Sequence, residues 1–148
     1  MGDITHIDAL RANALNEIIQ SRMRSAKRWV WVTFQRAGFH RYPAASIDPM
    51  LESVSYLGTT HRHLFKFKVQ IEIFHNDRDV EFHMALNYCE SLLNGQIDLD
   101  YKSVEMLSDD LYTHLAIKYT GRDIRIEVSE DGECGCLVEY LAQNQKNN

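Results

Sequence analysis

The chain has 148 residues, of which 45% are hydrophobic, and this size and composition predict a single domain over residues 1–148. Its formal net charge of −5 excludes the overall basic field that nonspecific nucleic-acid binding requires, so we do not expect a nucleic acid as its partner. It contains no apolar run of about 18 residues, and its opening residues, MGDITHIDAL, lack the pattern of a signal peptide, so we expect a cytoplasmic protein without a membrane partner.

The first element in chain order is an amphipathic helix, which we predict over residues 3–22. Apolar side chains recur there at helical spacing, and Asp3 is in position to cap the first turn. These apolar residues are Ile4, Ile7, Leu10, Ala14, Ile18 and Ile19.

Two long strands follow. The segment KRWVWVTFQRAGFH alternates between two faces, with Trp29, Trp31 and Thr33 on one and Val30 and Val32 on the other. Residues 41–60 hold both prolines and predict a connection with a helical turn near residues 50–56. From His63 to Ile73 the odd positions are mainly aromatic or β-branched and the even positions mainly charged, which predicts a strand with one wet face.

The rest of the chain predicts two helices and a hairpin. Apolar residues recur at helical spacing over 80–93 and 103–119, with Ser103 as the N-cap of the second helix. Residues 123–141 indicate a strand, an Asp-Gly turn and a strand, and the polar tail 142–148 is expected to fray. The core, 28–141, is therefore predicted to be α+β: a four-stranded antiparallel sheet in the order ββααββ, with two helices on one face. Its exposed edge strands favour a homo-oligomer.

His61 and His63 are candidate metal ligands. Side chains two positions apart on a strand project from the same face, about 7 Å apart, so both could reach one ion. The alternative is that they are polar residues on the wet face of the sheet. Spacing alone permits zinc but does not require it.

Four short strings occur in the order typical of one family. They are HRHLF with His61 and His63, VEF at Val80 to Phe82, SVEM at Ser103 to Met106, and IRIEVSED with Glu130. With the predicted element order, the chain resembles the tunnelling-fold (T-fold) family of 6-pyruvoyltetrahydropterin synthase and 6-carboxytetrahydropterin synthase. The string HRHLFKFKVQIEIFHNDRDVEF is also similar to strings in uncharacterised phage proteins.

The resemblance implies an oligomer with ligand sites at subunit interfaces and zinc on three histidines, the first of them His40 in GFHRYPAA. It also implies that Glu130 anchors a heterocycle. A carboxylate can accept two hydrogen bonds from the guanidine-like edge of guanine or a pterin; the alternative is a solvated acid beside a hairpin turn. The family's cysteine and inter-helix histidine are missing, because 41–60 contain no Cys and 94–103 no His. We therefore assign no catalytic residue.

The remaining candidates are side chains that could bind a phosphorylated or planar ligand. Arg36, Arg41 and Arg62 could contact phosphates, and Phe39 and Tyr42 could stack on a ring. The first functional hypothesis is a T-fold-like protein that binds a purine nucleotide or pterin-like heterocycle without synthase chemistry, such as a phage protein that sequesters a nucleotide signal. The second is a zinc-dependent enzyme of the lyase or synthase type acting on a pterin or deazapurine precursor. The third is an interaction module with no small-molecule site.

Overall fold

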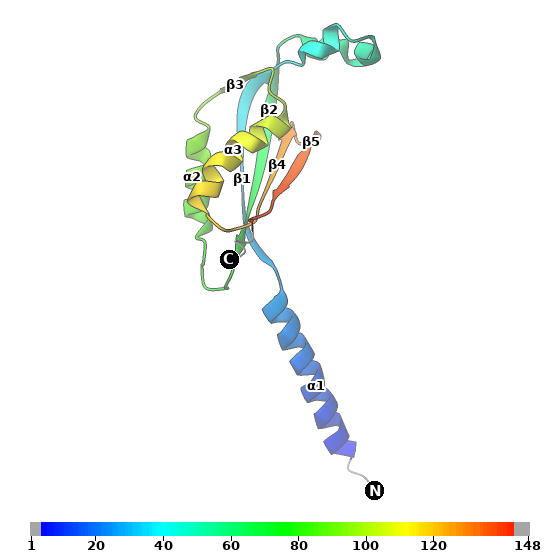
Figure 1. Cartoon of the computed structure of the whole chain (residues 1–148), viewed down its shortest axis with the longest axis vertical. Coiled ribbons are helices and arrows are strands. Elements are labelled where there is room, and N and C mark those ends of the chain that lie inside the picture. The colour runs from blue at the N-terminus through cyan, green and yellow to red at the C-terminus, as the bar shows by residue number, and fades with distance from the viewer. Residues whose placement is uncertain (1–3, 144–148) are drawn as a thin grey trace.

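The computed structural model describes residues 4–143. Its α-helices are α1 (Ile4–Ser25), α2 (Phe82–Leu92) and α3 (Val104–Lys118), and two 3-10 segments are η1 (Pro43–Ser46) and η2 (Pro49–Gly58). Its strands are β1 (Arg28–His40), β2 (His61–Ile73), β3 (Ile97–Asp100), β4 (Ile124–Glu130) and β5 (Cys134–Tyr140). The fold is α+β (Figure 1), as the sequence predicts.

The sheet has the strand order β3-β1-β2-β4-β5 and is mixed. The pairs β1·β2, β2·β4 and β4·β5 are antiparallel, and β3 adds a fifth strand that runs parallel to β1. The expected four-stranded, wholly antiparallel sheet therefore differs from the structure. The sequence did not indicate β3 because its buried positions, Ile97 and Leu99, form too short a pattern to be separated from a loop.

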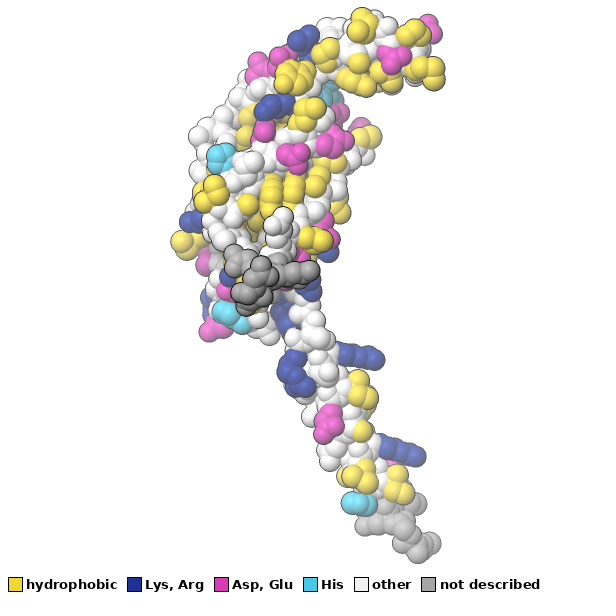
Figure 2. Space-filling model, in the orientation of Figure 1, with side chains coloured by type: hydrophobic (Ala, Val, Ile, Leu, Met, Phe, Trp, Pro, Cys, Tyr) yellow, Lys and Arg dark blue, Asp and Glu magenta, His cyan; other side chains and the backbone are white. Residues whose placement is uncertain are grey.

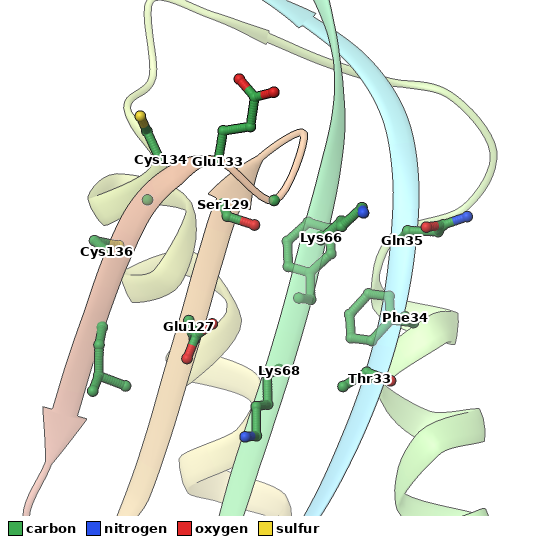
Figure 3. Close-up of a pocket in the computed structure, with 14 residues that line it drawn as sticks. Thr33, Phe34, Gln35, Lys66, Lys68, Glu127, Ser129, Glu133, Cys134 and Cys136 are labelled. Carbon is green, nitrogen blue, oxygen red and sulfur yellow. The ribbon is translucent and has the colours of Figure 1, made fainter.

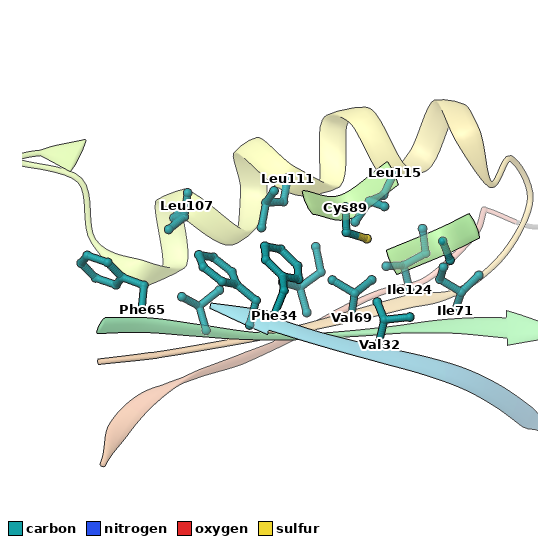
Figure 4. Packing of buried hydrophobic residues seen from close by; sticks show 14 of the residues in the cluster. Val32, Phe34, Phe65, Val69, Ile71, Cys89, Leu107, Leu111, Leu115 and Ile124 are labelled. Atoms are coloured by element: carbon teal, nitrogen blue, oxygen red, sulfur yellow. The ribbon is translucent and has the colours of Figure 1, made fainter. Parts of the chain in front are cut away.

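One face of the sheet carries α2 and α3, and the core lies between these layers (Figure 4). Phe65, Phe67, Val69 and Ile71 are all buried there, which confirms the alternation predicted for β2. They pack with residues of α3 such as Leu111. The predicted cap of α3 is also confirmed, because Ser103 Oγ accepts a hydrogen bond from the backbone N–H of Met106 at 3.2 Å.

The first helix stands apart from this core. In Figure 1, α1 extends away from the sheet, and in Figure 2 its surface carries apolar and basic side chains. Its predicted cap, Asp3, and residues 144–148 of the predicted frayed tail lie outside the described residues. None of the helices within 4–143 is long and apolar enough to cross a membrane.

A charged network fixes the loop between β2 and α2. Arg122 donates hydrogen bonds to both carboxylate oxygens of Asp79, at 2.7 and 3.0 Å, and the backbone N–H of Phe74 donates to Asp79 Oδ2 at 2.7 Å. The Arg122 guanidinium and, after it, the Phe74 N–H hold the pKa of Asp79 well below its ordinary value. The ionised carboxylate is therefore the form on which this loop depends.

Candidate metal centre

The three predicted histidines meet at one end of the core face. His40 is the last residue of β1 and pairs with His61, the first residue of β2, while His63 lies two positions further on. The ring centroids are 4.7 Å apart for His40 and His61, 5.1 Å for His40 and His63, and 4.9 Å for His61 and His63. One ring nitrogen of each lies within 4.8 Å of the others, so the three side chains could hold a metal ion.

The Nδ1 atom of each ring faces an oxygen that can only accept a hydrogen bond. His61 Nδ1 lies 2.7 Å from the carbonyl oxygen of Thr59, His63 Nδ1 lies 2.6 Å from Asp131 Oδ2, and His40 Nδ1 lies 3.4 Å from the carbonyl oxygen of Lys102. For His61 and His63 these acceptors favour the tautomer with the proton on Nδ1, which leaves the lone pair on Nε2, the arrangement typical of histidines that bind a metal. His40 differs, because its Nε2 lies 3.0 Å from Glu130 Oε1, closer than its Nδ1 lies to the carbonyl oxygen of Lys102.

The Nε2 atoms of His61 and His63 are buried and have no hydrogen-bond partner among the described residues. His63 Nε2 lies 3.4 Å from Glu130 Oε2, which is close enough for an ion pair but does not form a hydrogen bond. Buried polar atoms without a partner are costly and uncommon in proteins. A cation between the rings would supply the missing partner for both lone pairs.

Burial also favours the uncharged form of the His40 side chain, because this residue is only 8% exposed. Desolvation lowers the pKa of His40, although the nearby Glu130 carboxylate acts in the opposite direction. A neutral imidazole is the form that binds a metal.

Glu130 lies beside the histidines. Its Oε1 is 3.0 Å from His40 Nε2, and its Oε2 is 3.4 Å from His63 Nε2. The resemblance predicts this residue as an anchor for a heterocycle; the structure places both carboxylate oxygens near ring nitrogens that could hold a metal. From there the carboxylate can complete a coordination sphere or exchange a proton with a ligand.

Asp131 is a site residue that the sequence did not indicate. It follows β4 in the hairpin turn, where Asp131 has φ 57° and Gly132 has φ 77°, as a type I′ turn requires. Its Oδ1 accepts a hydrogen bond from the backbone N–H of Leu64 at 2.8 Å, while its Oδ2 faces His63. The Asp-Gly pair was sufficient to predict the turn, but nothing local connects Asp131 to β2.

A cavity of about 440 Å³ adjoins the centre. Its wall includes His40, His61 and Glu130, together with two of the predicted ligand residues, Arg41 and Tyr42. Arg41 is held in place by Asp100, with 2.8 Å between Arg41 Nε and Asp100 Oδ1. Two further side chains of the wall, Tyr101 and Glu105, were not singled out from the sequence.

The structure does not bring the other predicted ligand residues to the cavity wall. Arg36 donates hydrogen bonds to the carbonyl oxygens of Leu93 at 2.6 Å and Glu90 at 3.1 Å, and so stabilises the C-terminal end of α2. Arg62 lies between His61 and His63, and Phe39 precedes His40. Because side chains alternate along a strand, Arg62 and Phe39 project from the opposite face.

A second hollow, of about 740 Å³, lies over the face of the sheet that carries no helix (Figure 3). Charged and polar side chains of both signs line it, among them Lys66, Lys68 and Glu127. Cys134 borders both hollows. The three histidines are not part of this surface.

Neither a model of a known protein family nor the sequence of a curated protein matches this chain. The chemistry of the site is therefore inferred from its own donor atoms, their partners and their burial.

Proposed function

We propose that the protein binds zinc through His40, His61 and His63 and acts on a small heterocyclic molecule held in the adjoining cavity. The observation that carries this proposal is the orientation of the rings. Their Nδ1 atoms face fixed acceptors, and the Nε2 atoms of His61 and His63 are buried without a hydrogen-bond partner among the described residues. A hydrogen-bonded cluster without metal would leave these two lone pairs unsatisfied.

The donor set fits zinc better than a hard cation. Imidazole nitrogen suits zinc, whereas calcium and magnesium prefer oxygen ligands. Three histidines leave a fourth position of a tetrahedral site, and zinc in such a site polarises a group of the substrate. Tetrahedral coordination at about 2.1 Å would place ligand atoms about 3.4 Å apart, so the three ring nitrogens, which now lie within 4.8 Å of one another, would need to move closer together on binding.

Glu130 is the side chain that we propose for proton transfer. Its oxygens are 3.0 and 3.4 Å from two of the proposed ligand nitrogens, so a group bound at the centre would lie within hydrogen-bond reach of the carboxylate. The Glu130 side chain is 30% exposed, which leaves it open to the cavity. It can therefore accept a proton from a bound molecule and return it.

The cavity supports a planar, polar ligand. Tyr42 and Tyr101 offer aromatic rings at its wall, and Arg41 offers a guanidinium that is already paired with Asp100. The wall also includes Ser103 and Val104 at the beginning of α3, the end of a helix that favours negative charge. Together with the resemblance to the T-fold synthases, these features favour a pterin-like or purine-like molecule.

Binding without chemistry is the second candidate function. The observation that favours it is the lack of a cysteine in 41–60 and of a histidine in 94–103, which removes the acid–base pair that the resemblance implies. In this case the zinc centre would orient a purine nucleotide or pterin, and Glu130 would only bind it. Turnover distinguishes the two functions.

Native mass spectrometry of protein purified without chelator tests the metal first. We expect one zinc per chain in the wild type and none in His61→Ala, whereas the matched control His83→Ala, on the exposed surface of α2, should keep its zinc. Wild-type protein that takes up no zinc after incubation with zinc would remove the basis of both functions.

The second step uses zinc-loaded protein and 7,8-dihydroneopterin as the probe. If the protein is an enzyme, Glu130→Gln should retain zinc and lose roughly 10² to 10⁴-fold in turnover, as expected for loss of a general acid–base group. Binding of the probe without turnover by the wild type would support the second candidate. Absence of binding would exclude pterins as the ligand class.

A further inference from the structure

α1 presents an apolar surface that nothing in the described chain covers. Every described side chain in 5–25 is exposed. The large apolar residues among them are between 44% and 58% exposed: Ile7, Leu10, Leu15, Ile18, Ile19 and Met23. Figure 2 shows apolar side chains exposed along this helix, with charged side chains between them.

Such a helix gains little stability by itself. α1 has 22 residues and is about 33 Å long, and isolated helices of this kind are marginal in water unless an apolar face is buried. The opposite side of α1 is polar, with Asn13, Asn16 and Gln20 on it. The apolar side is therefore the one that needs a partner.

We propose that α1 pairs with α1 of a second copy of this chain in antiparallel orientation, with the two-fold axis passing beside Leu15. Asp8, Leu15 and Arg22 follow one another at intervals of seven residues and so lie close to one line along the helix. Asp8 and Arg22 are equally distant from Leu15. An antiparallel pair centred there places Asp8 of each copy level with Arg22 of the other.

The same arrangement places Arg11 of one copy level with Ile18 of the other and on the same flank of the pair. The aliphatic stem of Arg11 can therefore pack against Ile18. A parallel pair would instead set Asp8 against Asp8, Arg11 against Arg11 and Arg22 against Arg22. Charge complementarity therefore selects the antiparallel pair.

A second copy fits this helix better than a lipid surface does. Helices that lie on membranes carry mainly Lys and Arg beside their apolar side. α1 instead carries charges of both signs, namely Asp8, Arg11, Glu17, Arg22 and Arg24. The Asp8 carboxylate is suited to a partner that presents Arg22 at the same level, as a second copy in reverse direction does.

Charge exchange tests the pairing in the full-length protein by sedimentation equilibrium. Asp8→Arg and Arg22→Asp, each alone, should weaken association roughly tenfold or more, because each creates like-charge contacts at both ends of the pair. The double variant Asp8→Arg/Arg22→Asp should restore it. Asn16→Arg, on the polar side, is the matched control and should associate like the wild type. A monomeric wild type, or a double variant as weak as the single variants, would overturn the proposal.

Cysteine cross-linking tests the orientation. In a Cys134→Ser/Cys136→Ser background, Leu15→Cys should form a disulfide between two copies on mild oxidation, whereas Arg22→Cys should not, because only a parallel pair brings the two positions 22 together. Circular dichroism confirms that each variant keeps its helix. Two results would overturn the proposal, because each would show that α1 docks in another way. One is cross-linking of Arg22→Cys. The other is the absence of cross-linking of Leu15→Cys in a protein whose association the charge variants still weaken.

Discussion

His63 and Asp131 lie 68 positions apart in the sequence, yet 2.6 Å separates His63 Nδ1 from Asp131 Oδ2. The other carboxylate oxygen of Asp131 accepts a hydrogen bond from the backbone N–H of Leu64 at 2.8 Å, and the Asp131 N–H donates to the Leu64 carbonyl at 2.9 Å. The hairpin turn after β4 is thereby attached to β2 at the residue that follows His63. One aspartate both fixes the turn and orients a proposed metal ligand.

Asp131→Asn should weaken zinc binding about 10 to 100-fold, the usual effect of losing a partner that orients a metal ligand. Asparagine tolerates the positive φ of this turn and can still accept from Leu64, so the fold should remain. Competition with a chelator measures the affinity, and ¹⁵N NMR of the His63 ring measures its tautomer. Glu133→Gln, in the same turn, is the control. Equal zinc affinity in both variants would show that Asp131 does not position His63.

Removal of zinc should lower the thermal stability of the wild-type protein. An ion that binds only the folded state contributes about 2.7 kcal/mol when its free concentration is about 100 times its Kd. For a chain of this size that corresponds to a fall in Tm of roughly 5–10 °C. Calorimetry with and without chelator measures it. His61→Ala should melt at one temperature under both conditions, and His83→Ala should behave like the wild type; a wild-type Tm that chelator leaves unchanged would contradict the prediction.

Asp79→Asn should remove a pH-dependent part of the stability. The pKa of Asp79 is lower in the folded protein than in the unfolded chain, where it is about 3.9. The contribution of the Asp79 carboxylate to the free energy of unfolding is therefore complete above about pH 3.9 and is lost as the pH falls toward the pKa of Asp79 in the folded protein. The variant should therefore melt well below the wild type at neutral pH, and the difference should shrink below about pH 4. Thermal melts between neutral and acidic pH check this. Asp77→Asn, whose side chain is 90% exposed, is the control and should show no such convergence.

Gly38→Ala should destabilise the sheet where β3 joins β1. A Cβ at this position would lie 2.5 Å from Ile97 Cγ1 and 2.7 Å from the Ile97 carbonyl oxygen, so β3 would have to move. Overpacking of this kind costs about 1–3 kcal/mol. Denaturant unfolding measures the loss, with Thr33→Ala, at an exposed position of the same strand, as the control. If the two variants were equally stable, the contact between β1 and β3 would be looser than the structure indicates.

Local patterns were sufficient for most of the secondary structure. The alternation from Phe65 to Ile71 predicts β2, Ser103 predicts the beginning of α3, and Asp131 with Gly132 predicts the hairpin turn. Each of these signals is read within a few residues, because backbone periodicity, capping and turn geometry depend on near neighbours. The pairing of His61 and His63 also follows from spacing on one strand.

The tertiary structure decided the contacts between residues that lie far apart in the sequence, which local patterns cannot predict. The register of β1 against β2 sets His40 beside His61, and the end of β4 brings Glu130 to the rings of His40 and His63. Only packing reveals that β3 joins the sheet and that Arg36, predicted to bind a ligand, instead stabilises α2. The sequence by itself determined most of the elements, with β3 as the exception, and which residues could bind a metal. Their assembly into one buried centre depended on strand register, which joins residues too far apart in the chain for any local signal to connect.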